Sequence, residues 1–236
     1  MTSVVVGMVD LRRALASVAP HADPDPDMAL LHRVHCAVGP VNLTVSATQR
    51  FTVAHAIVSI EDNAAGDLVA FDLLPIEVKQ ILDLFKPPKI KGVNPNEQVL
   101  RLDITEKLLT VTDIAGLFAG KALTLPRQPL DQEFPDVQAV LRTRLAAAAT
   151  PTDRLITSGH LFGLFTVASR VYGEPLVIEP TGSRTSMTIS CGDSFVGLLM
   201  PIAVDEEKTQ QINAWHADWL TRLGDESTGY EPREGS

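Results

Sequence analysis

The sequence lacks the features that mark several large classes of protein. It contains only two cysteines, Cys36 and Cys191, and no Cys-x-x-Cys pair of the kind that binds zinc or exchanges electrons. No run approaches the roughly 18 apolar residues of a membrane span. The first residues have neither the basic start nor the long apolar stretch of a secretory signal. We therefore predict a cytoplasmic protein that keeps both thiols reduced and has no membrane partner.

Signatures of catalysis and of metal binding are also absent. The chain has no Gly-x-Ser-x-Gly turn, no Gly-rich phosphate loop ending in Lys-Ser or Lys-Thr, and no His-Glu-x-x-His helix. His32, His35 and Cys36 are close in sequence, but on an extended segment they do not converge, and no second cluster completes a tetrahedral site. The sequence predicts a binding protein that is not an enzyme and holds neither a metal nor a cofactor.

The composition is that of a globular protein. Of the 236 residues, 45% are hydrophobic and 21% are charged, so the chain can bury a substantial core. The formal net charge of -9 argues against coating of nucleic acid, because that binding depends on many neutralised phosphates. A local basic strip is compatible with this charge.

A pattern of a short strand or turn, an amphipathic helix and three strands recurs three times. The spacing of three and four residues between apolar side chains predicts the helices, which end before Pro20, begin at Pro75 and begin after the N-cap Ser158. Their apolar stripes are Met8, Leu11, Leu15 and Val18; Val78, Ile81, Leu82 and Phe85; and Leu161, Phe162, Phe165 and Ala168. The segment His21–Asp27, with three Asp and two Pro, predicts a solvated turn.

Alternation of apolar and polar residues predicts the strands. In the first copy they are Leu30–Val38, Val41–Ala47 and Arg50–Ile60; in the second, Leu68–Asp72, Gln98–Thr105, Leu108–Ile114 and Leu117–Leu125; the third copy starts at Arg154–Thr157 and continues with Leu176–Pro180, Thr185–Cys191 and Phe195–Ile202. Residues 1–126 thus hold two copies, 127–152 form a linker, 153–204 hold the third copy, and 205–236 form a tail. The tail has an amphipathic docking helix with Trp215 and Trp219 and a disordered end.

Three short motifs resemble the bacterial sliding clamp, the beta subunit of DNA polymerase III, and its phage relatives. Residues 45–51, Val-Ser-Ala-Thr-Gln-Arg-Phe, look like the family's strand ending in Ala-Thr-Asp-Gly-x-Arg-Leu, with a turn shortened by two residues. Residues 133–140 are similar to its Phe-Pro-Asp linker, and residues 198–202 resemble its closing strand, which ends in Met-Pro. The resemblance spans about residues 1–204. It implies an α+β DNA-clamp fold of repeated strand-helix-three-strand units, with antiparallel sheets outside and helices inside.

The resemblance also implies a hydrophobic cleft that binds peptides ending in Leu-Phe, carried by polymerases, loaders or repair enzymes. Carried over from the motifs, its lining is Arg50, Phe51, Pro135, Val140, Leu198, Met200 and Pro201. Cations off the apolar stripes are the expected DNA-facing residues: Arg12, Arg13, Lys79, Lys86, His160 and Arg170. Residues 80–85, Gln-Ile-Leu-Asp-Leu-Phe, look like such a peptide themselves, but their apolar side chains are needed for packing of the second helix.

Compared with the family, one domain and half of another are missing, so the third copy has no partner copy within the chain. It could pair with the third copy of another chain in a homo-oligomer, be covered by the linker and tail, or pair with a degenerate copy hidden in the linker. Three functions follow: a processivity clamp that encircles duplex DNA without reading sequence, a non-encircling adaptor or decoy that binds clamp-interacting proteins, or a structural oligomer in which Trp215 and Trp219 fill the groove of a neighbouring chain.

Overall fold

The computed structural model describes residues 1–63, 68–88, 94–128, 133–147, 154–180 and 186–223. Residues 1–201 form one compact unit, and residues 202–236 form a second one. Within the described ranges, no helix is long and apolar enough to span a membrane. No three His, Cys, Asp or Glu side chains in these ranges are grouped to hold a metal ion.

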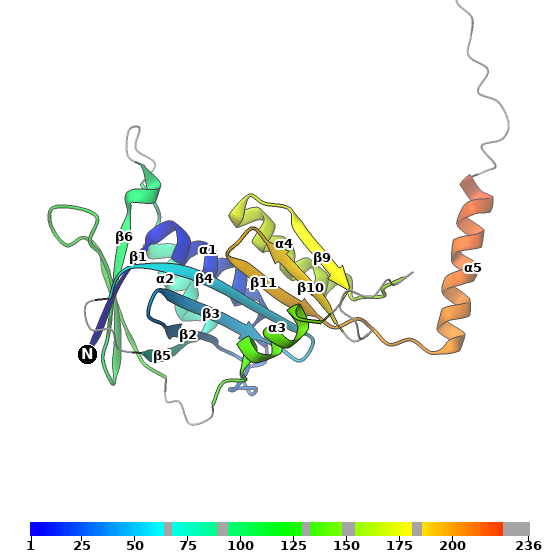
Figure 1. Cartoon of the computed structure of the whole chain (residues 1–236), viewed down its shortest axis with the longest axis horizontal. Coiled ribbons are helices and arrows are strands. Elements are labelled where there is room, and N and C mark those ends of the chain that lie inside the picture. The colour runs from blue at the N-terminus through cyan, green and yellow to red at the C-terminus, as the bar shows by residue number, and fades with distance from the viewer. Residues whose placement is uncertain (64–67, 89–93, 129–132, 148–153, 181–185, 224–236) are drawn as a thin grey trace, which may run out of the picture. The chain divides into compact units, whose positions relative to one another are not determined.

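The described residues of the first unit form one antiparallel sheet and four α-helices (Figure 1). Its helices are α1 (Met8–Val18), α2 (Pro75–Leu84), α3 (Val137–Leu145) and α4 (Gly159–Tyr172), with short 3-10 helices η1 (Ala19–His21) and η2 (Pro95–Glu97). Its strands are β1 (Thr2–Gly7), β2 (Val34–Val38), β3 (Asn42–Thr48), β4 (Thr52–Asn63), β5 (Val69–Leu73), β6 (Val99–Ile104), β7 (Leu108–Asp113), β8 (Ala122–Pro126), β9 (Leu176–Pro180), β10 (Met187–Cys191) and β11 (Phe195–Leu199).

The first two copies exchange their leading strands. Strand β1 pairs with β6 of the second copy, and β5 pairs with β2 of the first copy, which gives the order β5-β2-β3-β4-β1-β6-β7-β8. The helices begin and end where the sequence signals lie: Pro75 opens α2, and the Glu77 carboxylate accepts the Leu74 N–H at 2.8 Å. Ser158 caps α4, and Gly173 ends it with a φ of 77°.

The third copy is joined to the first through the long strand β4. One edge of β4 pairs with β3, while its other edge is shared: Thr52–Ala56 pair with β11 and Ile60–Asn63 pair with β1. Helix α4 packs on α1. None of the three predicted arrangements contains this pairing within the chain. Residues 154–158 form no strand, so the third copy begins at its helix.

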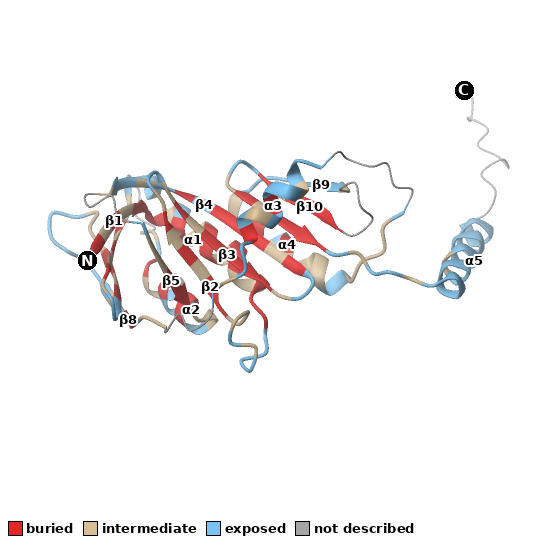
Figure 2. Cartoon of the chain, turned by 60° about the horizontal axis from the view of Figure 1, so that its bottom comes forward, coloured by how far each residue is buried: buried red, intermediate tan, exposed pale blue. Residues whose placement is uncertain are grey.

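The main core lies between the sheet and the helices α1, α2 and α4, which carry their predicted apolar stripes on the buried side (Figure 2). Helix α3 lies on the opposite face of the sheet. Strand β11 contributes to packing on both faces, because its alternate residues point to opposite sides. Phe195 and Leu199 join the main core, whereas Leu198 packs with Val137 and Leu141 of α3. The segment predicted as a plain linker therefore contains a helix, and its Asp136 N-cap accepts the Ala139 N–H at 2.9 Å.

Two other segments differ from the sequence predictions. Residues Leu117–Lys121, expected to be the start of a strand, form a loop, and β8 begins only at Ala122. His21, expected in a solvated turn, is fully buried, with its ring 4.4 Å from that of Phe165 in an edge-to-face arrangement. Both predictions were wrong because composition reports the average polarity of a segment and not the neighbours that the fold supplies.

The second unit contains helix α5 (Glu206–Leu223), which has no buried residue. The Asp205 carboxylate accepts the Lys208 N–H at 2.8 Å and caps its first turn. Lys208 lies 4.6 Å from the Trp215 ring, and Arg222 lies 5.6 Å from the Trp219 ring. These cation-π contacts cover part of the apolar stripe that the sequence predicts. The end predicted to be disordered lies outside the described residues.

Candidate functional site

An apolar groove of about 190 Å³ lies where three distant segments of the first unit meet. These segments are the turn between β3 and β4 with the adjoining strand ends, helix α3, and β11 with the residue that follows it; Ser186, just before β10, adds to the lining. The groove is lined by Thr48, Gln49, Arg50, Phe51, Thr52, Val53, Val140, Arg144, Ser186, Leu198 and Met200. It is smaller than the roughly 300–1,000 Å³ of small-molecule sites, so it suits individual side chains of a partner.

The turn between β3 and β4 is held by hydrogen bonds centred on Thr52. The Gln49 N–H and the Thr48 hydroxyl donate to the Thr52 carbonyl at 3.0 and 2.9 Å, and the Gln49 side chain donates to Thr52 Oγ1 at 3.1 Å. Nδ1 of the buried His21 lies 3.1 Å from the same hydroxyl oxygen. The fixed turn leaves Phe51 at its tip with 53% of its surface exposed.

Strand β11 forms the wall beside this turn. Leu198 is the ladder partner of Val53, and the Met200 N–H donates to the Phe51 carbonyl at 2.9 Å. Leu198 is buried, whereas Met200 is 46% exposed. The β4–β11 pairing thus supplies both a buried floor and an exposed apolar rim.

Helix α3 forms the third side. Val137 and Leu141 pack with Leu198, which leaves Val140 and Arg144, one helical turn apart, on the groove. Val140 is 45% exposed. The helix therefore uses one stripe for packing and a neighbouring stripe for the groove.

A polar cluster anchors the segment before α3. The Phe134 ring stacks on His35 with 4.8 Å between centroids and lies 5.7 Å from the Arg33 guanidinium. Both of these residues bind the carboxylate of Asp72, at 2.6 Å for Arg33 and 2.7 Å for His35. The Asp72 side chain is fully buried, so this ion pair is shielded from solvent. The cluster fixes the start of α3 on the sheet.

The structure brings together five of the seven residues predicted to line the cleft: Arg50, Phe51, Val140, Leu198 and Met200. Pro135 and Pro201 do not line the groove. The sequence reasoning missed the other lining residues, which are Thr48, Gln49, Thr52, Val53, Arg144 and Ser186. The four-residue spacing between Val140 and Arg144 could have suggested Arg144 once α3 was recognised.

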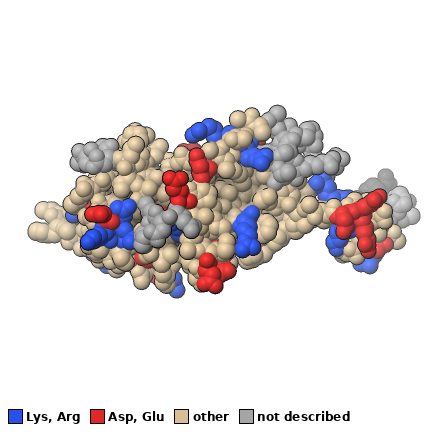
Figure 3. All heavy atoms as spheres, turned by 90° about the horizontal axis from the view of Figure 1, so that it is seen from below, with Lys and Arg blue, Asp and Glu red and all other residues tan. Residues whose placement is uncertain are grey.

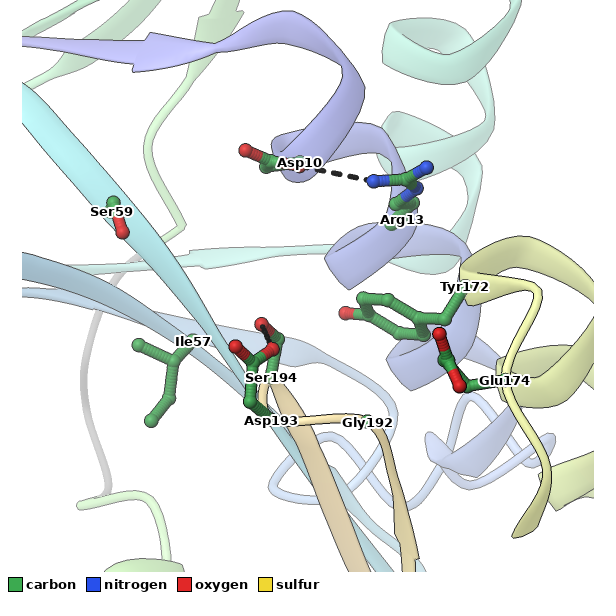
Figure 4. Close-up of a pocket in the computed structure, with 9 residues that line it drawn as sticks. All are labelled: Asp10, Arg13, Ile57, Ser59, Tyr172, Glu174, Gly192, Asp193 and Ser194. Carbon is green, nitrogen blue, oxygen red and sulfur yellow. Dashed lines mark hydrogen bonds and ion pairs between the residues drawn. The ribbon is translucent and has the colours of Figure 1, made fainter. Parts of the chain in front are cut away.

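A larger cavity of about 480 Å³ lies where α1, β4, the end of α4 and the turn between β10 and β11 meet (Figure 4). Asp10 and Arg13 come from α1, Ser59 and Ile57 from β4, Tyr172 and Glu174 from the end of α4, and Gly192, Asp193 and Ser194 from the turn between β10 and β11. Burial raises the pKa of Tyr172 to about 12, so its hydroxyl stays neutral. The lining includes three carboxylates and one arginine, and this polar lining does not suit an apolar peptide.

Comparisons with solved structures place the first unit among known folds. The DNA polymerase III beta subunit of Thermotoga maritima superposes with a TM-score of 0.62 at 13% identity, over 87% of this chain and 66% of that one. The DNA polymerase sliding clamp of Bacillus subtilis gives 0.60 at 12%, over 86% and 64%. The chain has the sliding-clamp fold. It spans about two thirds of the length of these clamps, which is more than the half that a missing domain and a half would leave.

Comparison of the sequence gave no further relatives. No protein-family model matches the chain, and no curated protein matches it. The Pseudomonas aeruginosa sliding clamp, with a TM-score of 0.56, is 14% identical over 90% of this chain and 68% of that one. At these identities the clamp likeness concerns the fold, and the function must be argued from the residues.

The clamp-fold helices do not offer all of their predicted cations to a ligand. The Arg12 guanidinium donates to the carbonyls of Leu82 and, at 2.6 Å, of Phe85, so it ties α1 to the end of α2. Burial lowers the pKa of Arg12. Arg13 donates to the Val171 carbonyl at 3.2 Å and lies 3.4 Å from Asp10. Both arginines are used to hold helices together.

The other predicted cations are exposed. Lys86 lies 3.3 Å from Asp83, while Lys79, His160 and Arg170 are exposed on α2 and α4. On the face shown in Figure 3, Lys and Arg side chains are scattered among Asp and Glu side chains. Of the predicted cations, Lys79, Lys86, His160 and Arg170 are thus exposed, and Lys86 lies beside Asp83.

Proposed function

We propose that this clamp-fold protein is a non-enzymatic binding module that captures short apolar peptides of replication or repair proteins in the groove. The observation that carries the proposal is the convergence of Arg50 and Phe51, Val140, and Leu198 and Met200 from three distant segments on one groove. Exposed apolar walls with a polar rim are how peptide anchors are captured.

The chemistry of the groove defines the peptide. Phe51, Val140 and Met200 are each about half exposed in the free protein, so they gain burial when an apolar side chain enters. Arg50 and Arg144 also line the groove and carry positive charge. A peptide that ends in Leu-Phe and carries a carboxylate nearby matches both features.

Replacement of groove residues tests this function. Phe51→Ala and Met200→Ala should each weaken binding of a fluorescent Leu-Phe-terminated peptide about tenfold, which corresponds to ~1.4 kcal/mol. Ile76→Ala is the matched control, because Ile76 is 57% exposed on α2 and should leave the affinity unchanged. Unchanged affinity in both groove variants, with native circular dichroism, would show that the peptide does not bind here.

Tethering to duplex DNA is the second candidate function, and the exposed Lys79, His160 and Arg170 support it. The solved structures are named as a DNA polymerase III beta subunit and a DNA polymerase sliding clamp, and a homo-oligomeric ring of this chain would act as a processivity clamp. The double variant Lys79→Glu, Arg170→Glu should weaken DNA binding and flatten its salt dependence. If the wild-type protein shows no DNA binding at low salt, with or without a loader, the chain acts as an adaptor that does not encircle DNA.

A further inference from the structure

The loop between β7 and β8 presents two apolar side chains to solvent. Leu117 is 99% exposed and Phe118 is 84% exposed, the two highest values among large hydrophobic side chains in the described part of the chain. Single exposed apolar residues are ordinary on protein surfaces. Two adjacent side chains with almost no contact to their own protein form a ready-made apolar anchor for another surface.

The base of this loop is closed by hydrogen bonds. The Asp113 N–H donates to the Lys121 carbonyl at 2.9 Å, and the Gly120 N–H donates to the Asp113 carbonyl at 2.8 Å. The Asp113 carboxylate also accepts the Ala115 N–H at 3.1 Å. The two apolar side chains therefore project from a defined hairpin end, which lowers the conformational entropy that a binding event must remove.

The loop is far from the groove of its own chain. It projects from the end of the first unit where β1, β6 and β8 lie, whereas α3 and the adjoining ends of β4 and β11 lie toward the other end (Figures 1 and 2). The compact core of the unit lies between the two features. A contact between this loop and this groove therefore requires two molecules.

We propose that Leu117 and Phe118 of one copy insert into the groove of a second copy. The inference rests on the proposed function, because it takes the groove to be a receptor for apolar side chains. The groove presents apolar atoms of Phe51, Val140 and Met200 that are about half exposed, in a volume of about 190 Å³. The loop side chains cover these three exposed apolar groups and remove them from water.

The size of the contact determines its strength. An aromatic side chain buries about 150–250 Å², so an interface centred on Leu117 and Phe118 falls below the roughly 1,200–2,000 Å² of stable complexes. Association is therefore weak and depends on protein concentration. Because the loop and the groove are different surfaces, the contact is head-to-tail and extends to a closed ring or an open filament. A partner peptide bound in the groove excludes the contact between the two copies.

The average mass in solution tests the proposal, measured by light scattering over a concentration series. The wild-type mass should rise with concentration, and the Leu-Phe-terminated peptide should reverse this rise. The double variant Leu117→Ser, Phe118→Ser should remain monomeric and keep the wild-type peptide affinity. Leu68→Ser is the matched control, because Leu68 is 73% exposed elsewhere, and it should associate like the wild type.

Mixing two defective variants separates this contact from other modes of association. The loop double variant keeps an intact groove, and Met200→Ala keeps an intact loop but has an impaired groove. Each variant should be monomeric alone. An equimolar mixture should form dimers that do not grow, since the mixture holds only one functional combination, the loop of Met200→Ala and the groove of the loop double variant.

A concentration-independent wild-type mass, or association that persists in the loop variant, would overturn the inference and leave peptide capture standing. Loss of peptide binding in the wild type would overturn the proposed function itself.

Discussion

Acidification from pH 7 to pH 5 should destabilise the first unit through His21. This ring is fully buried between Phe165 and Phe195, with Nδ1 3.1 Å from Thr52 Oγ1. Burial lowers its pKa from 6.5 to about 3. The folded protein therefore keeps His21 neutral at a pH at which the unfolded chain already binds a proton.

The sign and magnitude follow from proton linkage. Between pH 6.5 and about 3 the unfolded state holds more protons, so the free energy of unfolding falls as the pH falls. Each pH unit in this window contributes about 1.36 kcal/mol. At pH 5, which is about 1.5 units below the ordinary pKa of histidine, the loss due to His21 is about 2 kcal/mol.

Urea unfolding followed by far-ultraviolet circular dichroism measures this loss. Tryptophan fluorescence is unsuitable, because both tryptophans, Trp215 and Trp219, lie on α5 in the second unit. The comparison is with His21→Phe, which keeps an aromatic ring but cannot titrate. Other histidines, including His55, whose pKa burial also lowers, contribute equally to both proteins. Wild type should therefore lose about 2 kcal/mol more than the variant between pH 7 and pH 5. Equal losses would refute the assignment of a buried neutral His21.

Three further substitutions test the packing around the groove. In Gly197→Ala, the new Cβ would lie 2.6 Å from Phe165 and 2.5 Å from the Val53 carbonyl. The free energy of unfolding should therefore fall by about 1–3 kcal/mol. In the control Gly163→Ala, the new Cβ meets no heavy atom within 4 Å, so the change should stabilise α4 by up to about 1 kcal/mol. Urea unfolding measures the stability of both glycine variants. Equal effects would contradict the packing argument. Phe134→Ala removes the stacking on His35 and should lower peptide affinity roughly fivefold, or about 1 kcal/mol, without unfolding the protein. Fluorescence anisotropy measures that affinity, and a wild-type value would mean that α3 needs no anchor.

The cleft residues were predicted from motif resemblance and not from periodicity. Phe51, Val140 and Met200 carry no local signal that sets them apart from core residues. Their meeting depends on the pairing of β11 with β4 and on the packing of α3 against Leu198. The turn at Leu117 was misread for a related reason: an apolar run predicts a strand whether or not the fold provides a neighbour to cover it.

The amino-acid sequence by itself determined the amphipathic helices α1, α2 and α4 and the alternating strands, because periodicity and caps such as Pro75 and Ser158 act over a few residues. Tertiary structure alone decided which elements became neighbours. The third copy pairs with β4 because half of one β4 edge is left open by β1 and the small Gly197 lets Phe165 approach it. That choice joins residues distant in sequence, where local pattern carries no information, and it creates the groove.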